Sequence, residues 1–342
     1  MIVLSGLGFG GFIFLKKSQK SLPQNVTTSP SSVYQGKFID THAHLRISDY
    51  SLAEVASILD QYKIEKMFLM QTPVPANESR NSSLPADFGI PEAARKFPEK
   101  FAVLYQNEAF KLLSEVVEKK NFTPEQEEQF KKLLRQAASS GQYLGFGELV
   151  IRHFPQPNVR DPQEKEARDI FVPGDHPWML ILSDIAAEYN LPLDIHIEPN
   201  AETIPGFEKL IAHNPKTKII YDHAGWYNTG KGTAEWLGEM MAKYPNLYAN
   251  IKLRQPTNDE QKIVRILDDN GKIISDWLEL FQKNPEKFMI GSDVKFDRQS
   301  ETSENNYDRI FISYKNFLAQ PPIDLAKKIA ITNAQTIFGL KD

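Results

Sequence analysis

Six side chains that can bind a metal ion lie at or near the ends of short, β-rich segments of this 342-residue chain. They are His42, His44, Glu148, His196, His223 and Asp293. Alternate residues of a strand point to the same face, so His42 and His44 can direct both imidazoles at one cation. Each residue alone has a plainer explanation as a structural hydrogen-bonding group, and Glu148 alone could pair with Arg152. Their recurrence at the ends of several strands predicts a metal site instead.

The composition limits which side chains can hold a metal at that site. The chain has no cysteine, which excludes thiolate nucleophiles and cysteine-bound metals, so a divalent metal must be held by His, Asp or Glu. Of the other histidines, His176 and His213 are expected to begin and end helices, whereas His153 in the loop after Glu148 is left open. The net charge of −4 disfavours a general nucleic-acid binder, which would show a basic stripe. A small-molecule substrate is therefore expected.

Short apolar runs and amphipathic helices alternate along most of the chain. Such alternation predicts a parallel sheet, and eight units of it predict a (β/α)8 TIM barrel. In this fold the active site lies at the C-terminal ends of the strands, where the six side chains fall. The eight runs are 37–44, 65–71, 101–106, 143–149, 192–197, 218–223, 247–252 and 287–293, and the predicted helices include 51–62, 125–139, 176–190, 276–283 and a helical tail at 322–340.

The N-terminus differs from the rest of the chain. Residues 1–17 read as a hydrophobic signal or anchor segment, although its apolar part is shorter than the ~20 residues that span a bilayer. Residues 18–35 are rich in Ser, Thr, Pro and Gln, which indicates a flexible linker, and the barrel is expected over 36–342. We expect a membrane-tethered or exported protein. The basic residues after the apolar run leave a cytoplasmic location as the alternative.

The order of the motifs resembles the amidohydrolase superfamily, in particular its amidohydrolase-related branch, which includes aminocarboxymuconate-semialdehyde decarboxylase. H-x-H alone is weak, but its order with the later His, His and Asp is specific. The resemblance covers about residues 37–340. It rests on F-I-D-T-H-A-H-L (38–45), G-F-G-E-L (145–149), D-I-H-I (194–197), Y-D-H-A-G-W (221–226), I-G-S-D (290–293) and I-T-N-A-Q-T-I-F-G-L (331–340).

The resemblance also implies how the metal is held. The resemblance implies that the buried metal is bound by His42, His44 and Asp293, and that the site is completed by His196 and His223. Glu148 occupies the position where some members of the superfamily have a carboxylate or a carboxylated lysine that bridges two metals. One or two ions, with zinc as the expected metal, both remain open, and the presence of Glu148 favours two. The competing interpretation places Glu148 outside the ligand shell.

The expected function is that of a metal-dependent hydrolase acting on a small, anionic amide, lactone or ester. A divalent cation activates water for attack on a carbonyl or phosphoryl centre. Asp293 would take the proton from that water and pass it to the leaving group. His223 would stabilise the developing oxyanion if it is not a metal ligand. The candidates for substrate binding are Arg46, Arg152, His153, Trp226 and Lys252, with Arg80, Tyr227 and Arg254 in neighbouring loops.

Two other functions use the same kind of scaffold. A non-oxidative, metal-dependent decarboxylase would release carbon dioxide rather than a hydrolysed product. A TatD-type nuclease would also use H-x-H, Glu, His, His and Asp, but the acidic balance disfavours it, and G-E-L-V (147–150) departs from that family's G-E-I-G-L-D. The sequence leaves the oligomeric state open, a homo-oligomer included.

Overall fold

The computed structural model describes residues 33–45, 49–71, 90–106, 108–154, 169–226, 231–253, 264–296 and 306–341. The predicted anchor segment and most of the linker lie outside the described residues, as do Arg46, Arg80, Tyr227 and Arg254. The chain divides into residues 1–31 and residues 32–342, and the fold below is that of the second unit. None of the helices in the described part of the chain is long and apolar enough to cross a membrane.

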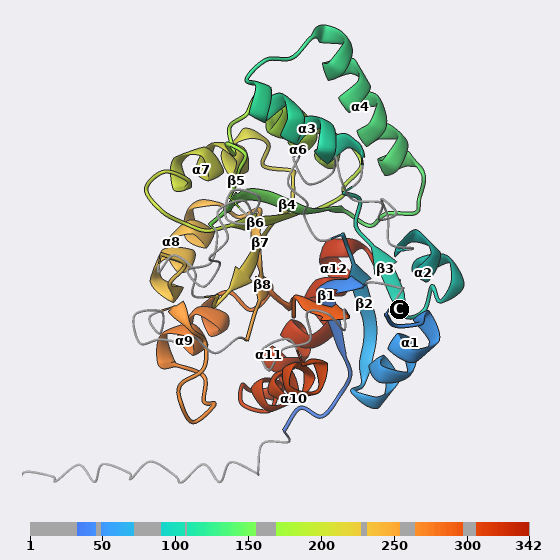
Figure 1. The fold of residues 1–342 in the computed structure, drawn as a ribbon. Coiled ribbons are helices and arrows are strands. Elements are labelled where there is room, and N and C mark those ends of the chain that lie inside the picture. The colour runs from blue at the N-terminus through green and yellow to red at the C-terminus, as the bar shows by residue number, and fades with distance from the viewer. Residues whose placement is uncertain are drawn as a thin grey trace, which may run out of the picture. The chain divides into compact units, whose positions relative to one another are not determined.

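Eight parallel strands form the ring that Figure 1 shows end-on. Hydrogen-bonded neighbours run in the order β3, β2, β1, β9, β8, β7, β6, β4. A parallel bridge between Tyr105 and Phe146 then joins the segment after β3 to β4, so the ring is continuous. This confirms the predicted (β/α)8 barrel. The strands are β1 (Phe38–Leu45), β2 (Ile64–Leu69), β3 (Phe101–Val103), β4 (Phe146–His153), β6 (Leu193–Ile197), β7 (Ile219–Ala224), β8 (Leu247–Ile251) and β9 (Phe288–Ile290).

Helices cover the outside of the ring and bury one apolar face each against the strands (Figure 1). Local sequence begins several of them. Ser51 and Thr123 each form a capping box with the residue three positions later, which satisfies backbone N–H groups at the start of α1 and α4. The helices are α1 (Leu52–Gln61), α2 (Ile90–Lys96), α3 (Glu108–Lys119), α4 (Pro124–Ser139), α6 (Pro177–Glu188), α7 (Ile204–His213), α8 (Ala234–Lys243), α9 (Ser275–Lys283) and α10 (Tyr307–Leu318).

Two strands that carry or adjoin site residues, β4 and β9, end elsewhere than the sequence predicts. β4 continues to His153 because its last two residues pair with the short antiparallel strand β5 (Ile170–Phe171). Glu148 therefore lies within β4 rather than at its end, and His153 is a strand residue rather than a loop residue. β9 ends at Ile290, and the chain pairs with β1 again at β10 (Val294–Phe296). Asp293 lies in the gap between these two strands.

The C-terminal segment closes the end of the barrel where the strands begin. It consists of α11 (Ile323–Lys327), a π-helical turn η3 (Lys328–Thr332) and α12 (Asn333–Phe338). The ring of Phe338 lies 4.3 Å from that of Phe68 between centroids, inside the apolar cluster that fills this end. Asn333 donates hydrogen bonds to the carbonyls of Pro285 and Phe288, at the start of β9. The polar side chains of the candidate site lie at the opposite end of the barrel, where the strands end.

Candidate metal centre

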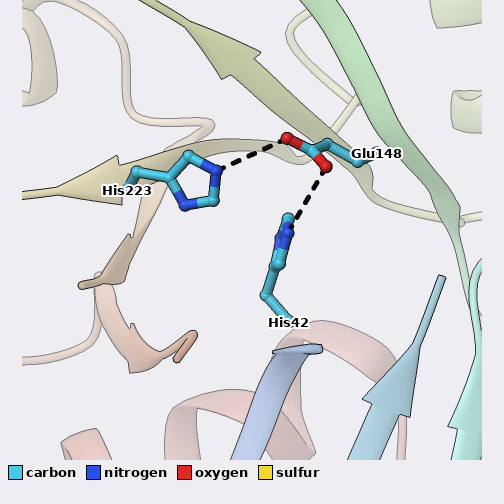
Figure 2. A group of neighbouring side chains, drawn as sticks. All are labelled: His42, Glu148 and His223. Carbon is cyan, nitrogen blue, oxygen red and sulfur yellow. Dashed lines mark hydrogen bonds and ion pairs between the residues drawn. The ribbon is translucent and has the colours of Figure 1, made fainter. Parts of the chain in front are cut away.

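The Glu148 carboxylate lies at the centre of the cluster, and its two oxygens face different histidines. Oε2 lies 3.6 Å from Nε2 of both His42 and His44. Oε1 lies 2.8 Å from Nδ1 of His196 and 3.4 Å from Nε2 of His223. Figure 2 shows this carboxylate between the imidazoles of His42 and His223. The structure thus brings the predicted histidines together from three strands around a carboxylate from a fourth.

The histidines of β1 are held so that their inner nitrogens face this carboxylate. Nδ1 of His42 lies 3.1 Å from Oδ1 of Asp194, and Nδ1 of His44 lies 3.1 Å from the carbonyl of Met70. A carbonyl or carboxylate at one ring nitrogen keeps the proton there and leaves the other nitrogen available to a metal. Nε2 of His42 is buried and has no hydrogen-bond partner among the described residues. A divalent cation fits this donor set.

A buried polar layer lies beneath His42. The Asn250 amide donates to Asp194 at 2.9 Å and to Asp222 at 2.7 Å, and it accepts a hydrogen bond from Thr41 at 2.7 Å. All these side chains are buried, so the layer holds the His42 ring from below. This layer was not predicted from the sequence. The sequence nevertheless carries a signal for it. Asp194 stands two positions before His196, and Asn250 stands two positions before Lys252, so each shares a strand face with the later residue.

Asp293 is held between a histidine and a lysine. Its Oδ1 lies 3.1 Å from Nε2 of His44, and its Oδ2 accepts a hydrogen bond of 2.6 Å from the Lys252 ammonium. Lys252 is 2% exposed, and its Nζ lies 4.0 Å from the centre of the Trp226 ring. The indole face and the carboxylate together compensate for burying a full positive charge. Both oxygens of Asp293 are therefore engaged.

The backbone at two site residues adopts a conformation that side chains usually avoid. His223 and Asp293 have φ angles of 62° and 52°, in the left-handed region. Non-glycine residues in that region are costly and concentrate at functional sites. Gly147 shows a related constraint, because a Cβ there would lie 2.6 Å from the Cβ of Asp194. Only glycine allows β4 to approach β6 closely enough to bring Glu148 to His196.

Electrostatics distinguish the two histidines that face Oε1. Burial favours the neutral form of Glu148, but hydrogen bonds with His196 and His223 hold its pKa well below the usual range. Burial opposes the charge on His196, yet Glu148 and Glu198 outweigh it and raise its pKa to about 9. Burial and the nearby Lys252 ammonium lower the pKa of His223 to about 3. A cation bound at this position would displace the proton of His196.

The predicted substrate residues fall into different surroundings. The Trp226 ring packs against His153, His196 and His223 with centroids 6.2, 5.4 and 5.5 Å away, so it lies at the mouth beside the cluster. His153 also lies 5.4 Å from the ring of His196. Arg152 instead forms an ion pair with Asp169 and donates to the carbonyl of Ile170. Its guanidinium thus joins β4 to the β5 segment, and Arg46 lies outside the described residues.

A further carboxylate near the histidines, Glu198, was not predicted. Glu198 is 1% exposed, and its Oε1 lies 3.6 Å from Nε2 of His196. Residues i and i+2 share a face on a strand, so H-x-E at 196–198 carried the same signal as H-x-H at 42–44. The remaining histidines are structural, as predicted: His176 caps the start of α6, and His213 ends α7 and hydrogen-bonds with Asp184.

An eight-stranded barrel with histidines and carboxylates gathered at the C-terminal ends of its strands has the architecture of a metal-dependent TIM-barrel protein. The family model described as amidohydrolase matches residues 113–340, and the chain belongs to this family. The predicted resemblance is confirmed. The matched range includes Glu148, His196, His223 and Asp293 and begins after the two histidines of β1.

Solved structures with the same fold include two decarboxylases. The 2,6-dihydroxybenzoate decarboxylase from Rhizobium is 12% identical, with a TM-score of 0.53 over 89% of this chain and 99% of that one. A 5-carboxyvanillate decarboxylase from Novosphingobium aromaticivorans, solved with bound manganese, is 13% identical, with a TM-score of 0.50 over 90% of this chain and 98% of that one. At these identities the likeness is one of fold. No curated protein matches the chain.

Proposed function

We propose that this protein is a divalent-metal-dependent decarboxylase that releases carbon dioxide from a small carboxylic acid. The observation that carries the proposal is the state of Asp293. Hydrolysis would require this residue to take a proton from water, but one of its oxygens is held by Lys252 at 2.6 Å and the other lies 3.1 Å from His44. Decarboxylation needs no deprotonated water. The decarboxylases that share the fold support the same choice.

The side chains around Glu148 would hold two cations. His42, His44 and Asp293, whose ligand atoms are within 4.8 Å of one another, would hold the first. His196 and His223, whose facing nitrogens converge on Oε1 of Glu148, would hold the second. The histidine-rich donor set suits zinc, and manganese is the second candidate because it is bound in the 5-carboxyvanillate decarboxylase structure.

The chain's own residues would then bind and orient the substrate. When bound, the metal supplies a Lewis acid that withdraws electrons from the substrate oxygens. Trp226 and His153 border the mouth, where the indole face can pack against the acid. In the reaction, the bond between the carboxylate carbon and its neighbouring carbon breaks, and carbon dioxide leaves. The electron pair stays on the neighbouring carbon, which takes up one proton.

A metal-dependent hydrolase is the second candidate, and the position of Glu148 favours it. A carboxylate that presents one oxygen to each of two histidine pairs suits two cations that share a nucleophile. The substrate in that case is an anionic amide, lactone or ester, and His223 would stabilise the oxyanion if it does not bind the second cation. The neutral state of His223, whose pKa is about 3, is compatible with a hydrogen-bonding role.

One experiment separates these functions. Purified protein loaded with Zn²⁺ or Mn²⁺ is incubated with a panel of aromatic and unsaturated carboxylic acids, and with lactones, amides and esters. The proposal expects carbon dioxide release that stops on chelation and returns when the metal is restored. Hydrolysis of a lactone or ester without carbon dioxide release would establish the second candidate. Elemental analysis that finds no bound metal would overturn both.

We also propose that residues 1–17 tether or export the protein. The apolar run over residues 1–15 supports this proposal. Fractionation of cells that express the full chain and a chain beginning at Gly36 tests it. Full-length protein found entirely in the cytosolic fraction would refute the proposal.

A further inference from the structure

The outer side of His196 faces a buried carboxylate. Glu198 follows β6 directly, is 1% exposed, and places Oε1 3.6 Å from Nε2 of His196. Burying a carboxylate costs several kcal/mol unless a positive or hydrogen-bonding partner compensates for the lost hydration. His196 is in position to provide part of this compensation through Nε2.

The two nitrogens of His196 face different groups. Nδ1 points to Oε1 of Glu148 at 2.8 Å, on the side where His223 also converges. Nε2 points to Glu198 and has no partner within hydrogen-bond distance among the described residues. A small closure of the 3.6 Å gap would form this bond. A proton on Nε2 would then leave Nδ1 free to bind a cation.

The same arrangement already exists at the two histidines of β1. Asp194 holds Nδ1 of His42, and the Met70 carbonyl holds Nδ1 of His44, so the opposite nitrogen of each ring faces inward. At His196 the two ring nitrogens exchange these roles: Nδ1 faces inward, and Nε2 faces outward. The carboxylate must then lie on the Nε2 side, which is where Glu198 lies.

We propose that Glu198 is a positioning residue that holds the Nε2 proton of His196 and thereby presents Nδ1 to the second cation. The inference rests on the two-cation site proposed above. It assigns to Glu198 a role in metal affinity at one position only, because the histidines of β1 have their own partners. Outer partners of metal-bound histidines typically change metal affinity by about 10–100-fold when removed.

Metal titration of the full-length, metal-free protein with Mn²⁺ tests the proposal. Wild-type protein should bind in two steps, and Glu198→Ala should weaken only the second step, by about 10–100-fold. Glu198→Gln, whose amide oxygen can still accept the bond, should restore most of the affinity. Glu202→Ala is the matched control, because Glu202 is an exposed glutamate in the turn after β6. Electron paramagnetic resonance should show loss of the coupled two-manganese signal in Glu198→Ala and retention of the single-ion signal.

Three results would overturn the inference. Equal second-step affinity in wild-type and Glu198→Ala is the first. The second is a wild type that binds a further ion in a third step, which Glu198→Ala loses while it keeps the two main steps. Glu198 and His153 would then hold a separate cation. A wild type that binds one ion is the third, and it also refutes the two-cation site. Binding in two steps without carbon dioxide release would refute the decarboxylase alone. If Glu198→Ala does not fold by circular dichroism, Glu198→Leu decides, because leucine fills a similar volume without a hydrogen-bond acceptor, and wild-type affinity at both positions with an unchanged spectrum would then overturn the inference.

Discussion

Replacing Lys252 by methionine is expected to destabilise the metal-free protein by about 3–5 kcal/mol, the usual cost of removing one partner of a buried ion pair. The Lys252 ammonium lies 2.6 Å from Oδ2 of Asp293, and at an effective dielectric constant of about 20 two unit charges at that distance attract by about 6 kcal/mol. The hydration that both groups lose on burial offsets part of this attraction. In the variant, the Asp293 carboxylate, 9% exposed, stays buried without its ammonium.

Urea unfolding followed by circular dichroism, in the presence of a chelator, measures this change. The double variant Lys252→Met/Asp293→Asn should be more stable than Lys252→Met alone, because it leaves no unpaired charge buried. Lys218→Met is the control. This half-buried lysine donates a hydrogen bond to the Ile337 carbonyl at the other end of the barrel, and losing that bond should lower the free energy of unfolding by about 1 kcal/mol. The reasoning is refuted if Lys252→Met lies within about 1 kcal/mol of wild type, or if the double variant loses the sum of the two single effects.

Three further predictions concern the metal, pH and the closed end of the barrel. His42→Asn should reduce bound divalent metal from about two ions to about one per chain by elemental analysis, because the buried Nε2 of His42 has no hydrogen-bond partner among the described residues and is available to a metal. Unchanged metal content would contradict the role of His42 as a ligand. In metal-free protein, the contribution of His196 to stability is complete below its unfolded pKa of about 6.5 and is lost as the pH rises through its folded pKa of about 9. The melting temperature without metal should therefore fall across that interval, and an increase would show that the sign is wrong. Phe338→Ala should lower the free energy of unfolding by about 3–5 kcal/mol, measured by denaturant unfolding. Ile323→Ala, at a side chain that is 40% exposed, should lower it far less. Equal decreases would mean that Phe338 does not fill the core.

The barrel and the inner histidines could be predicted because their signals are local. The alternation of His42 and His44 along one strand is a property of a few neighbouring residues, and so is the alternation of strands with helices. Helix starts such as Thr123-Pro124 follow from capping chemistry and agree with the structure. These features need no knowledge of which strands become neighbours.

The partners of the site residues could not be predicted in the same way. The pairing of Lys252 with Asp293 joins two strand ends that are distant in sequence, and the pairing of Arg152 with Asp169 depends on β5, a strand of two residues. Glu198 was missed for a different reason, since its H-x-E pattern was present and only its histidine was considered. Periodicity shows which side chains share a face, but the contacts across the barrel decide which charges are paired.

The position of α12 has a consequence for the order in which the molecule can be completed during synthesis. The strands and every metal-facing side chain precede α12 in the chain, so a ribosome makes Asp293 before it makes Phe338. Until that helix emerges, the apolar residues at the base of the barrel, such as Phe68, lack their covering partner. Newly made chains therefore carry a complete set of ligands before they carry a complete core. Such an intermediate exposes apolar surface and is a candidate for chaperone binding.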